Sequence, residues 1–180
     1  GVACSWNPEL ATVNTEQTAE VMRSVGATLA LSPMVDLIRT AHWPRIEESY
    51  GEDGYLSAAT GVAFVEGLQK NGLKDGVAAC TKHFLGYGGG SSLTWKEIFE
   101  EVLMPHEAMI RLADCKVLMT SYGRFRSEQA VSSDTLLNKI LRGYLEFDGL
   151  VVSDYGAVGH SSQKGNPEIL KQRAIEALVA

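Results

Sequence analysis

Residues 147–155 read FDGLVVSDY, a short apolar run that ends in a carboxylate. The aliphatic and β-branched residues 150–152 favour a strand that is covered on both faces, as in a parallel sheet. The acid after them is expected at the C-terminal rim of the sheet. In barrels of alternating strands and helices, this rim carries the catalytic side chains. Asp154 is therefore the first candidate catalytic residue.

Three other segments share this short, almost continuously apolar pattern, and helical patterns separate them. The predicted strands are residues 27–32, 77–82, 116–121 and 150–153. Helices are predicted at about residues 15–25, 56–68, 98–112 and 136–144, and from about residue 167 onward. Ser132 or Ser133 is the expected N-cap of the fourth helix. Alternating strands and helices predict an α/β fold with right-handed crossovers between parallel strands.

The number of strand–helix units favours part of a (β/α)8 TIM-type barrel. A complete barrel needs about 250 residues. This chain has 180 residues and about four units. The glycine-rich segment 86–90 lacks the spacing of a dinucleotide-binding loop, which argues against a doubly wound fold. Because the chain starts without Met and stops inside a helical pattern, we expect it to be an excerpt of a longer protein.

Composition narrows the possible partners. A net charge of −6 and a pI of about 5.2 argue against nucleic acid or an anionic membrane as the main partner. No apolar run approaches the roughly 20 residues that span a bilayer. Three cysteines cannot form a closed disulfide framework, and Cys80 is predicted to be a buried free thiol. No Cys and His spacing predicts a metal site, and no cofactor is predicted. The sequence predicts neither the oligomeric state nor the cellular location.

Polar side chains follow all four predicted strands. If the strands are parallel, these side chains converge at one end of the sheet. Each alone has a structural explanation as a cap, a turn former or a surface ion pair, but the combination indicates a functional site. The residues are Asp36, Arg39, Arg45, Glu47 and Glu48 after the first strand, Lys82 and His83 after the second, Tyr122 after the third and Asp154 after the fourth. His106 and His160 are expected to be structural, and Glu48 and Asp53 to organise the loop around Arg45.

The residue types at these strand ends suggest a sugar site. Positive charge from Lys82 and Arg45 favours the ionised form of a neighbouring carboxylate. An ionised carboxylate shielded from solvent can attack a polarised carbon. Lys, His and Arg donors around it suit a ligand rich in hydroxyl groups. This combination describes the centre of a retaining glycosidase.

A shared pocket for Lys82 and His83 requires an unusual backbone. Adjacent residues of a regular strand point to opposite faces of the sheet. An irregularity is therefore predicted at residues 82–84, as distorted backbone often accompanies active sites.

Several motifs, in this order along the chain, resemble the family 3 glycoside hydrolases, the exo-acting β-glucosidase and β-xylosidase group. They are CSWNP at 4–8, LSPMVD at 31–36, RIEESYGED at 45–53, KHF at 82–84, MTSY at 119–122, FDG at 147–149 and SDY at 153–155. The resemblance implies a (β/α)8-type barrel followed by an α/β sandwich domain. Residues 1–180 would then be a partial barrel domain, with the first strands and the sandwich domain outside this chain.

The resemblance also implies roles for individual residues. Asp154 is implied to be the nucleophile that forms the glycosyl-enzyme intermediate. The implied substrate-binding residues are Arg45, Lys82, His83, Met119 and Tyr122. Segment 39–45 reads RTAHWPR where the family commonly reads RDPRWGR, so we expect a different rim beside the sugar subsite. The turn that usually follows Tyr122 is also replaced, around residues 126–129.

A retaining mechanism needs a second carboxyl group as the general acid/base. In most of the family, that Glu is implied to come from the following domain. The N-acetylglucosaminidase branch instead uses an Asp-His pair in the loop after the Lys-His strand. Here residues 86–92 read GYGGGSS, with neither residue, so this branch is disfavoured. No acid/base is assigned within the chain, and the chain alone is expected to be inactive.

The expected function is that of a retaining exo-β-glycosidase acting on terminal non-reducing β-linked sugars. The expected substrates are small-molecule or oligosaccharide β-glycosides, with β-D-glucosides first. One alternative is a β-xylosidase of the same family. Another is a barrel lyase or aldolase that uses Lys82 as a Schiff-base amine. The third is a non-catalytic carbohydrate-binding remnant.

Overall fold

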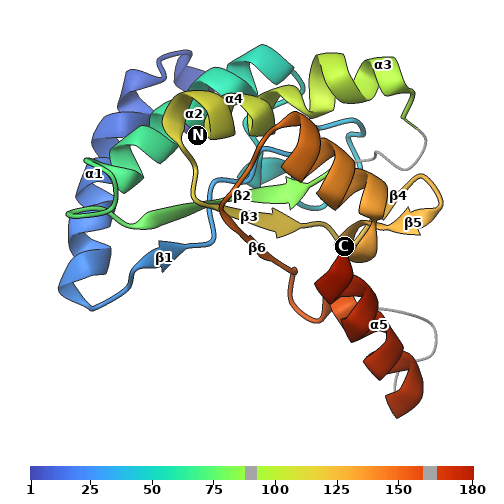
Figure 1. Ribbon diagram of the computed structural model, residues 1–180. Coiled ribbons are helices and arrows are strands. Elements are labelled where there is room, and N and C mark those ends of the chain that lie inside the picture. Colours follow the sequence, from blue (N-terminus) through green and yellow to red (C-terminus); the bar gives the residue numbers. More distant parts are fainter. Residues whose placement is uncertain (88–92, 160–165) are drawn as a thin grey trace.

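The computed structural model describes residues 1–87, 93–159 and 166–180. A curved parallel sheet lies under a layer of helices (Figure 1). Its strands, in the order β1-β2-β3-β6, are β1 (Leu29–Ala30), β2 (Ala78–Phe84), β3 (Val117–Thr120) and β6 (Leu150–Val152). All three neighbouring pairs are parallel. The predicted alternation of four parallel strands with helices is therefore confirmed.

The helices follow the predicted order along the chain. The α-helices are α1 (Glu9–Ser24), α2 (Gly54–Gln69), α3 (Trp95–Glu97), α4 (Met104–Ala113) and α5 (Pro167–Val179). Two π-helical segments are η3 (Ile98–Val102) and η5 (Thr135–Tyr144). Short 3-10 turns are η1 (Val2–Ser5), η2 (Ile46–Glu48), η4 (Ala130–Ser132) and η6 (Ala157–Gly159). Among the described residues, no helix is long and apolar enough to cross a membrane.

Three elements differ from the sequence prediction. The first strand has only two residues, and the chain continues beside β2 as far as a bridge between Met34 and Lys82. The helix predicted at 98–112 begins at Trp95 and is interrupted, because Pro105 has no N–H to donate to the preceding turn. The first helix begins at Glu9, earlier than expected.

A two-stranded antiparallel hairpin was not predicted. It consists of β4 (Arg124–Phe125) and β5 (Glu128–Gln129), in the segment that departs from the family's usual turn. Arg126 at its turn has a φ of 54°, and its guanidinium lies 4.4 Å from the ring centre of Trp95. The hairpin is thus held against α3.

The two faces of the sheet are covered unequally. Helix α2 packs between α1 and α4 over one face, and the large apolar clusters lie between the helices and the strands. On the other face a smaller cluster contains Cys80, Val117 and Met119, with Ala78 and Val152 against it. This second face corresponds to the interior of a barrel, which explains why the strands are apolar on both sides. The prediction of a buried free thiol at Cys80 is confirmed.

One buried side chain joins the start of β2 to the start of β3. The amide of Gln69 donates to the carbonyl groups of Ala113 and Asp114, at 3.3 and 2.9 Å. Its oxygen accepts the N–H groups of Ala79 and Lys116, at 3.3 and 3.1 Å. Buried backbone groups at these strand starts are thereby satisfied.

Capping side chains lie at the start of several helices. Asp53 accepts the N–H of Leu56 at 2.7 Å and so starts α2. Of the two serines expected to cap the fourth helix, Ser133 accepts the N–H of Leu136 at 3.1 Å.

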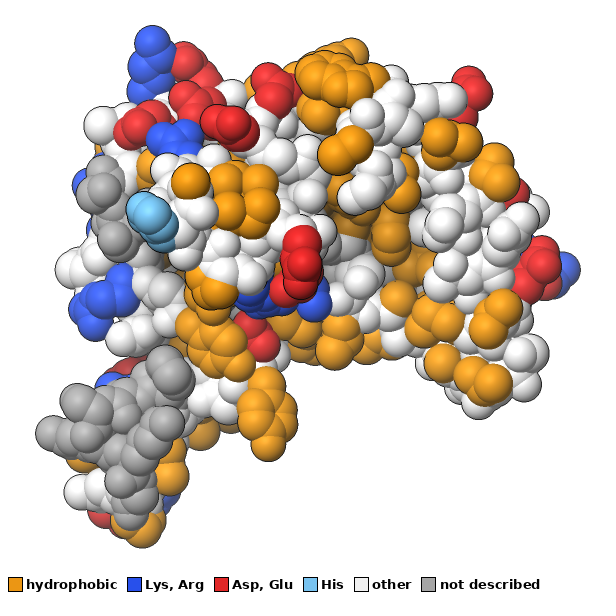
Figure 2. Space-filling model, turned by 180° about the vertical axis from the view of Figure 1, so that it is seen from behind, with side chains coloured by type: hydrophobic (Ala, Val, Ile, Leu, Met, Phe, Trp, Pro, Cys, Tyr) orange, Lys and Arg blue, Asp and Glu red, His pale blue; other side chains and the backbone are white. Residues whose placement is uncertain are grey.

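Hydrophobic side chains remain at the surface between charged ones (Figure 2). Within the described parts of the chain, β1 and β6 each pair with a strand on one side only. Leu150 of β6 is 57% exposed and Leu29 of β1 is 36% exposed. Unpaired strand edges with exposed aliphatic residues are surfaces that commonly receive a further strand.

Candidate active site

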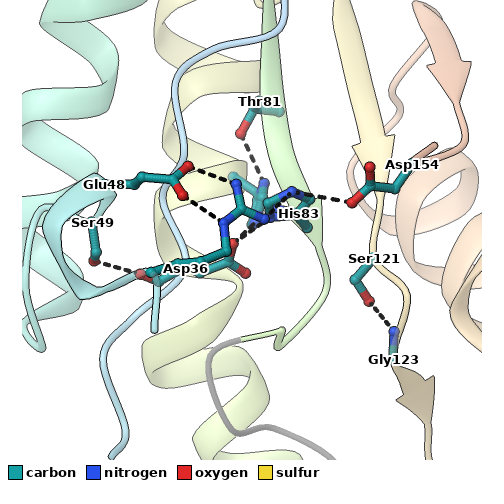
Figure 3. Close-up of polar contacts among 10 residues, drawn as sticks. Asp36, Glu48, Ser49, Thr81, His83, Ser121, Gly123 and Asp154 are labelled. Carbon is teal, nitrogen blue, oxygen red and sulfur yellow. Dashed lines mark hydrogen bonds and ion pairs between the residues drawn. The ribbon is translucent and has the colours of Figure 1, made fainter. Parts of the chain in front are cut away.

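The parallel strands bring the predicted site residues to one end of the sheet. His83 is the second-to-last residue of β2, and Asp154 follows β6. Arg45 reaches the same place from the long segment between β1 and η2. Figure 3 shows His83 between Asp36 and Glu48 on one side and Asp154 on the other.

The backbone of β2 is irregular where the sequence predicts it. The pairing register of β2 with β3 shifts between Thr81 and Phe84. The peptide bonds Lys82–His83 and Phe84–Leu85 are both cis. His83 is 1% exposed, whereas the adjacent Lys82 is half-buried.

His83 lies at the centre of the polar cluster. Its Nδ1 lies 2.7 Å from Oδ2 of Asp36, and the same oxygen accepts the His83 backbone N–H at 3.1 Å. On the other side of the ring, Nε2 lies 3.2 Å from Nη1 of Arg45 and 3.4 Å from Oδ2 of Asp154. The imidazole therefore connects a buried carboxylate to the proposed nucleophile.

Glu48 fixes the orientation of Arg45. Its two carboxylate oxygens accept from Nε and Nη2 of Arg45, both at 2.6 Å, in a bidentate pair. This pairing lowers the pKa of Glu48, and the charge of Lys82 lowers it further. It raises the pKa of Arg45 above its ordinary value. Glu48 thus organises the Arg45 loop, as the sequence suggests, whereas Asp53 caps α2.

Asp154 presents one carboxylate oxygen without a hydrogen bond. Its Oδ1 accepts the N–H of Tyr155 at 2.7 Å. Its Oδ2 is buried and has no hydrogen-bond partner among the described residues. The 3.4 Å approach of His83 Nε2 does not meet the geometry of a hydrogen bond. An oxygen with uncommitted lone pairs is suited to attack an electrophilic carbon.

The other predicted residues lie around this core. The Tyr122 hydroxyl donates to the carbonyl of Tyr155 at 2.6 Å. Burial raises the pKa of Tyr122, and the charge of Asp154 raises it further. Met119 is buried in the interior cluster with Cys80, below the polar groups. The ammonium group of Lys82 makes no hydrogen bond or ion pair with any residue that the structure describes, although its charge lowers the pKa of Glu48.

Sequence reasoning missed Tyr87 as a member of the site. Its ring centre lies 4.9 Å from that of His83, 5.7 Å from that of Trp43 and 6.1 Å from that of Tyr122. The guanidinium of Arg45 lies 5.7 Å from the same ring centre. The sequence feature that could have identified Tyr87 is its position in the loop directly after β2, at the end of the sheet where the site forms.

His106 supports β2 from behind the site. It is fully buried in α4, and its Nδ1 lies 2.9 Å from Oγ1 of Thr81. Its ring centre lies 5.2 Å from that of Phe84, with the two rings nearly perpendicular. The expected structural role is confirmed for this residue. Burial lowers the pKa of His106 to about 3. His160 and the segment 88–92 lie outside the described residues.

Neutral His106 makes stability depend on pH. Between about pH 3 and pH 6.5 the unfolded chain binds a proton at this residue that the folded chain does not. Stability is therefore lost as the pH falls below 6.5. In the complete natural protein that contains this chain (the complete protein), we expect a loss of about 2 kcal/mol from pH 7 to pH 5 through His106. Urea unfolding at both pH values measures this loss. The free energy of unfolding of His106→Gln should fall by about 2 kcal/mol less than that of the unaltered protein. Exposed His42→Gln should behave as the unaltered protein, and an equal loss in His106→Gln would contradict the prediction.

No group of three or more His, Cys, Asp or Glu side chains in the described residues is arranged to hold a metal ion. The polar groups of the site are instead the side chains of Arg45 and His83 and the carboxylates of Asp36, Glu48 and Asp154. This arrangement can bind hydroxyl groups and place a carboxylate against an electrophilic carbon.

Comparisons with known proteins agree with this arrangement. The model of the glycosyl hydrolase family 3 N-terminal domain matches residues 1–180. A β-xylosidase of Formosa agariphila is 39% identical over 87% of this chain and 24% of its own length. A β-glucosidase of Bacteroides ovatus is 32% identical over 87% of this chain and 21% of its own length.

A solved structure is similar over nearly the whole chain. A mutant β-glucosidase from Listeria innocua, in complex with laminaribiose, superposes with a TM-score of 0.89 and 33% identity. The match covers 97% of this chain and 26% of that protein, so the chain spans about a quarter of the length of such relatives. The likeness confirms the predicted fold class, an incomplete (β/α)8-type barrel. The chain belongs to glycosyl hydrolase family 3 and matches the N-terminal domain of that family.

Proposed function

We propose that the complete protein is a retaining exo-β-glycosidase, with Asp154 as the nucleophile. The observation that carries this proposal is the buried Oδ2 of Asp154 after β6, which has no hydrogen-bond partner among the described residues and lies 3.4 Å from Nε2 of His83. In a retaining mechanism such an oxygen attacks the anomeric carbon and forms a covalent glycosyl-enzyme intermediate, which water then hydrolyses. β-D-Glucosides are the proposed substrates.

The surrounding residues are proposed to hold the sugar. Lys82 supplies an ammonium group whose donors are not used by the described residues. Arg45 is preset by Glu48, so little side-chain freedom remains to be lost when a hydroxyl group binds. Tyr122 lies beside the nucleophile, and Met119 is proposed as part of the pocket wall below it.

The general acid/base is proposed to come from outside the chain. Retaining enzymes need a second carboxyl group about 5 Å from the nucleophile to protonate the leaving group. We also propose that residues 1–180 form part of the barrel and that further strands pair with the edges of β1 and β6. The exposed aliphatic side chains of Leu29 and Leu150 on those strands support this proposal.

A β-xylosidase is the second candidate, and one observation favours it. The relative at 39% identity is named a β-xylosidase, whereas the β-glucosidase of Bacteroides ovatus is 32% identical. Segment 39–45 also departs from the usual family sequence at the rim that carries Trp43 and Arg45. A changed rim is where a preference between two closely similar pyranose sugars would arise.

Product stereochemistry tests the proposed reaction. Incubation of the complete protein with an aryl β-D-glucoside, followed by NMR, should show β-D-glucose as the first sugar released, because two displacements retain configuration. Parallel rates with the aryl β-D-xyloside rank the two candidate specificities. Initial release of α-glucose would exclude a nucleophilic role for Asp154, and hydrolysis of neither substrate would argue against both candidates.

A further inference from the structure

We propose that Asp36 is a positioning residue that sets the protonation of His83 and thereby keeps Oδ2 of Asp154 free of a hydrogen bond. The inference rests on the proposed role of Asp154 as nucleophile. It concerns a residue that does not touch the reacting atoms. Asp36 would act through the imidazole that lies between the two carboxylates (Figure 3).

Asp36 is held rigidly and out of solvent. It is 3% exposed, and its carbonyl oxygen accepts from Oγ of Ser49 at 2.7 Å. The preceding residue is tied to β2, because the N–H of Val35 donates to the carbonyl of Lys82 at 2.9 Å. The backbone at Asp36 is thus held against β2 through Val35 and against Ser49 through its own carbonyl group.

One carboxylate oxygen of Asp36 contacts two nitrogen atoms of His83. Oδ2 accepts the backbone N–H of His83 at 3.1 Å and lies 2.7 Å from ring Nδ1. The other oxygen, Oδ1, is buried without a hydrogen-bond partner in the described residues. Burying a charged group with one oxygen unsatisfied is unfavourable. A functional role for the contact between Oδ2 of Asp36 and His83 would explain why a carboxylate occupies this position.

The contacts of the two ring nitrogens with Arg45 and Asp36 together indicate which nitrogen of His83 carries the proton. A guanidinium can only donate hydrogen bonds. Arg45 Nη1 lies 3.2 Å from Nε2 of His83, so Nε2 must be the acceptor. The ring proton then resides on Nδ1 and is donated to Asp36 at 2.7 Å. The geometry points to a neutral His83 in the Nδ1–H form.

This tautomer explains the unpartnered oxygen of the nucleophile. Without a proton, Nε2 cannot donate to Oδ2 of Asp154 across the 3.4 Å that separates them. With the proton on Nε2, the imidazole would donate to Oδ2 and engage a lone pair needed for attack. It would also lose the ability to accept from Arg45. Asp36 thus favours the state in which both Asp154 and Arg45 remain available to the sugar.

The tautomer can be measured directly on the complete protein. The 15N shifts of the His83 ring, assigned by their loss in His83→Gln, should show a protonated Nδ1 and an unprotonated Nε2. In Asp36→Ala, Nδ1 loses its acceptor among the described residues, and the proton should shift toward Nε2, where Oδ2 of Asp154 can accept it in competition with the donor from Arg45. Because the unaltered protein already reports the tautomer, the proposal remains testable even if Asp36→Ala does not fold. A protonated Nε2 in the unaltered protein would overturn it.

Kinetics should separate positioning from binding. For Asp36→Ala we expect formation of the glycosyl-enzyme intermediate to slow by about 10- to 100-fold, the usual effect of removing a group that orients a site residue. Affinity for a neutral sugar-shaped inhibitor should change less than about 3-fold, since the pocket donors remain. Asp36→Asn keeps an oxygen for both N–H groups and should retain the Nδ1–H tautomer and most of the rate.

Asp53→Asn is the matched control. It makes the same change of carboxylate to amide at a residue whose contact is the N-cap of α2, so rate and tautomer should be unchanged. An Asp36→Ala protein with protonated Nε2 and an unaltered rate would overturn the proposal. If the unaltered protein fails to form an intermediate on Asp154, the proposed function fails, whereas the 15N measurement still decides the tautomer.

Discussion

Replacement of Asp154 by asparagine in the complete protein should lower kcat by a factor on the order of 10⁴ or more, as expected when a nucleophile is removed. That factor corresponds to about 5.5 kcal/mol of transition-state stabilisation. An amide oxygen is far less nucleophilic than a carboxylate, so the covalent intermediate cannot form. Asparagine is nearly isosteric with aspartate and can still accept the N–H of Tyr155. Binding of a sugar-shaped inhibitor should therefore largely persist.

The measurement pairs kinetics with trapping. A 2-deoxy-2-fluoro glycoside with a good leaving group should accumulate the intermediate, and mass spectrometry of the digested protein should place the label on Asp154. Asp148→Asn is the control, because Asp148 is an exposed acid before the opposite end of β6 and should leave kcat unchanged. Label on any other residue, or turnover by Asp154→Asn within 10-fold of normal, would reject the assignment.

Some of this site is predictable from the sequence because it depends on local rules. An apolar run such as residues 150–152 requires burial on both faces, and parallel strands end at the same edge of the sheet. These two rules place Asp154 and His83 together before any distance is known. The conflict between alternating strand geometry and a shared pocket likewise predicts the irregular backbone at residues 82–84.

The partners of these residues depend on long-range placement and could not be predicted. Asp36 follows the apolar Val35 at a strand exit, by the same rule that selects Asp154. Its contact with His83, however, spans 47 residues and depends on the bridge between Met34 and Lys82. Tyr87 lies in the loop after β2, and no pattern of apolar residues predicts the path of that loop.

Other differences arise from backbone hydrogen bonding. The apolar spacing from Ile98 to Leu112 fits a continuous helix, but Pro105 cannot donate to the preceding turn and the helix divides into η3 and α4. The hairpin of β4 and β5 is too short to show alternation and is held by Arg126 on Trp95. Neither feature changes the spacing of apolar residues, so periodicity alone does not detect them.

Lys82→Ala should lower kcat/KM by about 10²- to 10³-fold, or about 3 to 4 kcal/mol, the usual effect of removing one charged donor that contacts the transition state. The physical reason is that the Lys82 ammonium has no hydrogen bond to a described residue and so can donate to a substrate hydroxyl. Its removal also takes away positive charge near Glu48, whose pKa it lowers. The loss should appear mainly in kcat if the contact tightens in the transition state.

Lys116→Ala is the control, because Lys116 lies at the start of β3, away from the site, and pairs with Asp114 at 2.6 Å. That variant should keep kcat/KM within about 2-fold, since surface ion pairs contribute little. A trapping experiment at Lys82 also distinguishes the proposed glycosidase from a lyase or aldolase. A Schiff-base enzyme would be trapped on Lys82 by borohydride in the presence of a carbonyl substrate. A glycosidase would not be trapped in this way, because its covalent bond forms at a carboxylate oxygen. Two results together would contradict the proposed glycosidase. They are borohydride labelling of Lys82 and an unchanged kcat/KM for glycosides in Lys82→Ala, and they would indicate that the Lys82 amine, not Asp154, is the nucleophile.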